Sequence, residues 1–185
     1  LMHDRLVMHG ATVRPDEWPV FGVVGQMTRQ LGGYSFHAHG GYSQEIYADY
    51  VQQATDGVEL LQMAHYRGIG LAGWYRILNI GYHFPALAGS DFPYTRALGD
   101  CRTYVHCNQQ PSFTDWARRA AAGRSFFTTG PLLLLEVNGK RPGDVIDLNG
   151  DATQKVNVRV RVRCEVTAIQ NLELIVGGQT KQRWS

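Results

Sequence analysis

The sequence is poor in cysteine, carries little net charge and contains no long hydrophobic run. Its three cysteines, Cys101, Cys107 and Cys164, are an odd number without a C-x-x-C pair, which argues against a disulfide framework and a structural zinc knuckle. No apolar run approaches the roughly 18 residues that span a bilayer, so we predict no membrane partner. The formal net charge is +2 and the 18 Lys and Arg residues are scattered, so nucleic-acid binding has little support.

The composition is that of a folded, globular chain. Hydrophobic residues make up 44% of the 185 residues and charged residues 18%, whereas a disordered chain would have far fewer apolar residues. This length suits one ordinary domain, alone or with a small accessory one. The chain starts with Leu1-Met2-His3-Asp4 and has no secretory signal. This unusual start predicts a fragment, and it leaves the cellular location open.

Strand and helix patterns alternate over the first two thirds of the chain. Helices are expected where apolar residues recur at three- and four-residue spacings, and strands where short apolar or β-branched runs occur. The expected helices are 44–54, 71–82 and 112–122, and the expected strands are 20–24, 36–39, 58–62, 84–88, 102–105 and 125–128. Such alternation favours a parallel sheet or barrel of the α/β class.

The helical patterns stop at Gly130-Pro131. Turn pairs typical of hairpins, Asn138-Gly139 and Gly177-Gly178, follow instead. The expected strands here are 132–137, 155–164 and 172–176. We therefore predict a small antiparallel β unit, sandwich-like in form.

Three arginines alternate with valines in this β unit. Arg159, Arg161 and Arg163 are each separated by one valine, which is typical of a strand with one solvated and one buried face. A solvated face is the favoured interpretation, and an anion site is the alternative.

Two histidines lie two residues apart in the short apolar segment 34–42. On a strand, His37 and His39 would point to the same face, because successive side chains alternate. Neutral imidazole is a common metal ligand, so the pair is a candidate metal site. A hydrogen-bonded interior role is the alternative, and His37 could instead orient His39 or a carboxylate.

Two carboxylates stand at or near expected strand ends, where the active sites of parallel α/β sheets lie. Glu59 falls inside an apolar strand, where a carboxylate needs a partner, and Asp91 follows a strand after a Gly-Ser pair. Imidazoles and carboxylates together suit Zn²⁺ or Mn²⁺. Two alternatives stay open, namely an ion pair of Glu59 with Arg67 or Arg76 and a helix N-cap role for Asp91.

Several short segments, in their order along the chain, carry a family resemblance. They are 31–42, 56–62 with Val58-Glu59, 73–79, 88–91 with Gly89-Ser90-Asp91, 99–105 and 124–131. Together they resemble the carbaryl-hydrolase-like branch of the PHP metallohydrolases, the polymerase and histidinol phosphatase superfamily. No single motif among them is specific, but the ordered set covers most of the chain.

The resemblance implies a distorted (β/α)7 barrel that holds divalent metals (zinc, manganese or iron). It implies hydrolysis of a phosphoester, amide or carbamate in a small-molecule substrate. Two ligands follow from it: His39, which precedes a glycine, and Asp91, which follows the Gly-Ser pair. His37 is the next candidate ligand and Glu59 a supporting residue. Arg76 or Arg96 could hold an anionic substrate group, with a surface or structural ion pair as the alternative.

The chain also departs from the family pattern. The family's first H-x-H motif and the Ser-Asp-Gly loop and Thr-Asp-His behind it are missing, and Pro93 stands where members often carry a histidine. We therefore expect residues 1–129 to be the C-terminal part of a PHP barrel with an incomplete metal site, and residues 130–185 a partial antiparallel β domain.

Two functions follow from this reading of the chain. The first is metal-dependent hydrolysis by the intact protein, of which this chain would be a part. The alternative is a non-catalytic binding module with a degenerate metal site. Half a barrel would expose strand edges, which favours pairing of two copies into a homo-oligomer.

Overall fold

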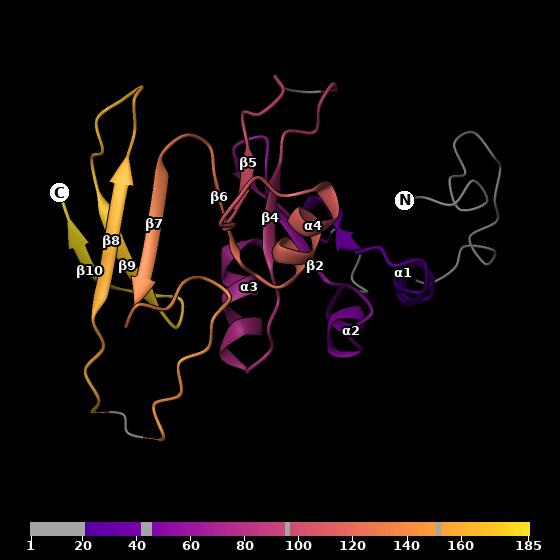
Figure 1. The fold of residues 1–185 in the computed structure, drawn as a ribbon, viewed down its shortest axis with the longest axis horizontal. Coiled ribbons are helices and arrows are strands. Elements are labelled where there is room, and N and C mark those ends of the chain that lie inside the picture. The colour runs from indigo at the N-terminus through magenta and orange to yellow at the C-terminus, as the bar shows by residue number, and fades with distance from the viewer. Residues whose placement is uncertain (1–20, 42–45, 95–96, 151–152) are drawn as a thin grey trace.

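Figure 1 shows a computed structural model of the protein, in which residues 21–41, 46–94, 97–150 and 153–185 are described. The helices are α1 (Phe21–Gln30), α2 (Ile46–Val51), α3 (Gly70–Asn79), α4 (Phe113–Ala121) and a short 3-10 helix, η2 (Ala38–Gly40). The first six strands are β1 (Phe36–His37), β2 (Gly57–Gln62), β3 (His65–Tyr66), β4 (Ala86–Gly89), β5 (Arg102–Val105) and β6 (Ser125–Thr128). The last four are β7 (Leu132–Val137), β8 (Val158–Arg163), β9 (Leu172–Val176) and β10 (Gln179–Trp184). None of the helices in the described ranges is long and apolar enough to cross a membrane.

A small sheet around β2 organises the first two thirds of the molecule. β1 and β4 run parallel to β2 on its two sides, and β3 pairs antiparallel with the end of β2. β5 and β6 form an antiparallel pair beside β4. Thr103 on β5 links the two units, because its hydroxyl accepts from the Ala88 amide at 2.8 Å and donates to the Ala88 carbonyl at 3.1 Å.

The predicted (β/α)7 barrel is wrong, because the described strands form separate small sheets, mostly antiparallel, that close no barrel. The parallel order stops at β4. A parallel crossover needs about a dozen residues, usually with a helix, and the described residues of the segment 90–101 contain none. α4 then returns the chain so that β6 runs antiparallel to β5.

The hydrophobic core lies between this sheet and the helices α2 and α3. Its buried members are Ile46, Tyr50, Val58, Leu60, Ile77, Phe84 and Ala86. Trp74 on α3 closes one side, and its indole nitrogen donates to the Phe84 carbonyl at 2.7 Å. Burial raises the pKa of the Tyr50 phenol, and the neighbouring Tyr82 adds to the effect. Full burial of such side chains contributes roughly 1.5–3 kcal/mol each, so this core dominates the stability of the region.

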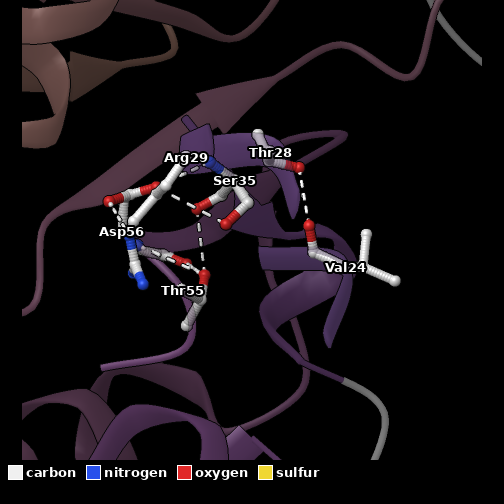
Figure 2. A network of polar contacts seen from close by, with 7 residues as sticks. Val24, Thr28, Arg29, Ser35, Thr55 and Asp56 are labelled. Atoms are coloured by element: carbon white, nitrogen blue, oxygen red, sulfur yellow. Dashed lines mark hydrogen bonds and ion pairs between the residues drawn. The ribbon is translucent and has the colours of Figure 1, made fainter. Parts of the chain in front are cut away.

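A polar network holds the amino ends of β1 and β2 together (Figure 2). The Asp56 carboxylate accepts from the Ser35 amide at 2.7 Å and lies 3.5 Å from the Arg29 guanidinium on α1. Thr55 donates its hydroxyl to the Ser35 carbonyl at 2.9 Å. These contacts set the register of β1 against β2, in which Phe36 faces Gly57.

Residues from β7 onward form two antiparallel pairs in place of the predicted sandwich-like region. β7 pairs with β8 and β9 pairs with β10, and Figure 1 shows all four on the side of the molecule away from α1 and α2. The turn between β9 and β10 contacts α3, where the Asn79 amide donates to the Gly177 carbonyl at 3.0 Å. The predicted division at residues 129 and 130 falls between β6 and β7 and stays a prediction.

One expected element has the wrong type. The strand predicted for 20–24 is replaced in its described part by α1, although its valines favour strands. As a helix, α1 packs closely against Ala54 through Gly25, where an added Cβ would lie 1.7 Å from the Ala54 carbonyl oxygen. Packing against the chain behind α2 therefore outweighs the local strand preference.

Candidate functional site

The two histidines of the H-x-H segment diverge. β1 ends at His37, and His39 adopts a left-handed backbone with φ 55° and ψ 34°. Gly40 and Gly41 continue with positive φ, and an added Cβ on Gly40 would lie 2.0 Å from the Arg67 carbonyl oxygen. The prediction that His37 and His39 share one strand face is therefore wrong, because the chain leaves the sheet between them.

His37 lies in a buried contact with α2. Its Nε2 is 3.0 Å from an oxygen of Asp49, and the two residues are only 3% and 4% exposed. The imidazole also stacks on Phe21 of α1, with ring centroids 3.9 Å apart. The structure thus packs His37 against α1 and α2, whereas His39 contacts β2.

His39 lies against two polar side chains of β2. Its backbone amide donates to Glu59 Oε2 at 3.0 Å, and its Nδ1 is 2.8 Å from Gln62 Oε1. Because an amide oxygen only accepts, this contact requires the proton on Nδ1. In the neutral imidazole the lone pair then lies on the other ring nitrogen, Nε2, and neutral imidazole is the form of histidine that binds metals.

Glu59 reaches from β2 toward the end of β4. An added Cβ on Gly89 would lie 2.1 Å from Glu59 Oε1, so the carboxylate occupies the space that a side chain there would fill. A register shift between Glu59 and Leu61 marks a bulge of β2 against β4 at this point. Bulges often re-aim a side chain near functional sites. The carboxylate therefore bridges the carboxyl ends of β1 and β4.

Asp91 lies two residues beyond β4 in a turn. It has a left-handed backbone with φ 56°, and its carbonyl accepts from the Tyr94 amide at 3.0 Å. Ser90 holds this loop, since its hydroxyl accepts from the Gly99 amide at 2.9 Å and donates to the Cys101 carbonyl at 3.3 Å. Within the described ranges no helix begins at Asp91, so the N-cap interpretation finds no helix to cap.

Of the two arginines predicted to hold a substrate, only Arg76 can be placed, and no described contact joins it to His39 or Glu59. Arg76 lies at an exposed position of α3, and Arg96 lies outside the described residues. Arg67 lies near His39 and Glu59, because its backbone amide donates to the Leu60 carbonyl and its own carbonyl lies against Gly40. In the part of the chain that the structure describes, Glu59 forms no ion pair with Arg67 or Arg76.

Gln62 is the site residue that the sequence interpretation missed. It is 2% exposed and ends β2, where a buried amide must have a hydrogen-bond partner. A glutamine at the end of a mainly apolar strand is the signal that the sequence offers. Its contact with His39 makes it the residue that orients the imidazole.

The donor set fits a divalent metal in part. The imidazole of His39 and the carboxylate of Glu59 are ligands that zinc and manganese accept. A catalytic zinc takes three protein ligands, and the described residues contain no group of three or more His, Cys, Asp or Glu side chains arranged to hold a metal. The described part of the site thus offers two donors, the His39 imidazole and the Glu59 carboxylate, which are joined by the hydrogen bond from the His39 amide to Glu59.

Comparisons with protein-family models, with curated proteins and with solved structures find no match to this chain. The resemblance to the PHP metallohydrolases therefore stays a prediction that rests on the segments quoted for it.

Proposed function

We propose that this chain contributes to a metal-dependent hydrolase that acts on a small phosphoester, amide or carbamate. The observation that supports it is the convergence of His39 and Glu59 at the carboxyl ends of the parallel strands, the edge at which open α/β sheets bind ligands. The chemistry proposed comes from the segment resemblance. Zinc, manganese or iron is the proposed metal.

The roles of the residues follow from their contacts. Gln62 fixes the tautomer and orientation of His39, and the His39 amide holds one oxygen of Glu59. His39 Nε2 and the Glu59 carboxylate are the proposed metal-facing groups, whereas Asp91, on the loop after β4, does not form a group of three with them in the described structure. A bound metal would lower the pKa of a water molecule and polarise the scissile carbonyl or phosphoryl group.

Metal binding by the purified chain tests this proposal. We expect titration with Zn²⁺ or Mn²⁺, followed by calorimetry and elemental analysis, to show saturable binding that weakens more than about tenfold in His39→Ala and in Glu59→Gln. His83→Ala is the matched control, because His83 is exposed and lies before β4, at the other end of that strand. Equal metal content in all three variants would contradict the assignment.

A second candidate is a non-catalytic binding module, which one observation favours. His39 and Glu59 are already engaged within the chain, by Gln62 and by a backbone amide, as in a purely structural network. This alternative predicts that Glu59→Gln lowers the melting temperature in EDTA and leaves metal uptake unchanged. The hydrolase proposal predicts the loss of uptake.

A further inference from the structure

A cavity separate from the His39 site lies between the β5–β6 pair and the β7–β8 pair. Its volume is about 460 Å³. This is within the range of about 300–1,000 Å³ that is typical of small-molecule sites. Figure 1 shows that β6 leads directly into β7, so the two walls are formed by consecutive parts of the chain.

The walls of this cavity are apolar. Tyr104 and Phe126 stack face to face on one wall, with ring centroids 5.2 Å apart. Leu132 and Leu134 line the other wall and are 41% and 49% exposed. Neighbouring exposed leucines that face stacked aromatic rings form the kind of apolar surface that binds ligands.

The charged side chains in the lining are mainly basic and mostly paired. Arg124 lies 3.7 Å from Asp144, and Arg141 lies 3.5 Å from Glu136. Arg161 also lines the cavity, and among the described residues it forms no ion pair. The guanidinium of Arg161 therefore lies beside the apolar walls with no ion-pair partner among the described residues.

The register of the β7–β8 pair directs Arg161 to this cavity. Arg161 is directly opposite Leu134, and paired residues project from the same face of a ribbon. The other two arginines of the alternating run have carboxylates nearby, since Arg159 is opposite Glu136 and Arg163 forms an ion pair with Glu165. Arg163 is also opposite a leucine, Leu132, but has Glu165 as its ion-pair partner, so Arg161 is the member of the run that has neither a carboxylate opposite it nor an ion pair among the described residues.

We propose that this cavity binds an amphipathic monoanion, namely the carboxylate form of an apolar carboxylic acid. The planar guanidinium of Arg161 matches a carboxylate in a bidentate arrangement. Tyr104, Phe126 and Leu134 cover the apolar body. The site is independent of the metal proposed for His39 and Glu59.

Calorimetry with 2-naphthoate and the full chain tests this proposal. We expect a dissociation constant below about 1 mM, and much weaker binding of 2-naphthylmethylammonium, which has the same body and the opposite charge. Acetate, which lacks the apolar body, is expected not to bind measurably. Equal affinity for the cation, or no heat from 2-naphthoate, would overturn the proposal.

Two variants and one matched control identify the residues involved. Arg161→Gln is expected to weaken 2-naphthoate about five- to tenfold, whereas Arg159→Gln, with the same charge change on the same strand face, leaves it within about twofold. Leu134→Ser weakens binding with an unchanged circular dichroism spectrum. Equal losses in the two arginine variants would mean attraction by net charge alone. Sedimentation showing a dimer that Leu134→Ser dissociates would make the cavity an interface between copies; either result rejects the proposal.

Discussion

The part of the molecule before β7 and the part after it are held together differently. Before β7, buried side chains such as Val58, Leu60 and Phe84 fill a core between the sheet and two helices. Among the described residues from Gly130 onward, none is buried. The later part depends on backbone pairing within β7–β8 and β9–β10 and on exposed ion pairs such as Arg183 with Glu173.

The two parts of the molecule therefore depend on different interactions for their stability. Isolated two-stranded ribbons are marginally stable in water, so the later part needs support from its neighbours. Described contacts that supply it include Asn79 on Gly177, the ring of Tyr75 against Gly178 and the ion pair of Arg124 with Asp144. We therefore expect the first part to set the stability of the whole, and the second to respond mainly through these contacts.

The largest predicted effect tests the core directly. Leu60 is fully buried, so Leu60→Ala is expected to lower the free energy of unfolding by about 2–5 kcal/mol through lost burial and the cavity left behind. Leu135→Ala on the partly exposed β7 is the matched control, and its loss is expected to be about 1 kcal/mol or less. Urea denaturation measures both, and equal losses would break the distinction between the two parts.

The next effect concerns a close backbone approach. Gly25→Ala would bring a methyl group to 1.7 Å from the Ala54 carbonyl oxygen, so α1 must shift, at about 1–3 kcal/mol. Gly130→Ala, just before β7, meets nothing within 4 Å and is expected to be neutral. Thermal unfolding compares the two, and a neutral Gly25→Ala would show that α1 is not tightly held.

Local sequence rules predicted many individual elements. The bounds of β5 and β6 agree with expectation, and α4 lies within the expected helix 112–122, with Ser112 as its N-cap, whose hydroxyl accepts from the Asp115 amide at 3.1 Å. These elements follow from short-range patterns and capping. The arrangement of strands depends on long-range pairing that no local pattern encodes, which is why a barrel was expected and separate sheets are found.

The candidate site shows the same limit at the scale of single residues. His39 and Glu59 were recognised as chemically suitable, and the structure brings them together. The predicted geometry of the two histidines was wrong, because it assumed that the strand continues beyond His37. Gly40 and Gly41 indicate a turn in this segment instead. Asp49, the partner of His37, comes from a different element, and a single sequence gives no direct indication of such a contact.

A smaller effect tests the connection between the two parts. Asn79→Ala removes the hydrogen bond to Gly177, which is exposed, so we expect a loss of about 0.5 kcal/mol. The informative measurement is hydrogen exchange in β9 and β10, which should quicken while exchange in β2 stays unchanged. Faster exchange in both would show that the two parts unfold as one unit.

The smallest effect depends on pH and concerns the exposed ion pairs. Hydrogen bonds from Arg118 and then Arg119 hold the pKa of Asp115 below its usual 3.8. A carboxylate with a lowered pKa stabilises the folded chain above pH 3.8 and loses this contribution as the pH falls through its folded value. Asp115→Asn should therefore lower the melting temperature slightly at pH 7 and leave it unchanged near pH 2.

Glu165→Gln, at the open end of β8, is the control in the other part. A larger effect there than at Asp115 would mean that ion pairs, more than backbone pairing, maintain the later part.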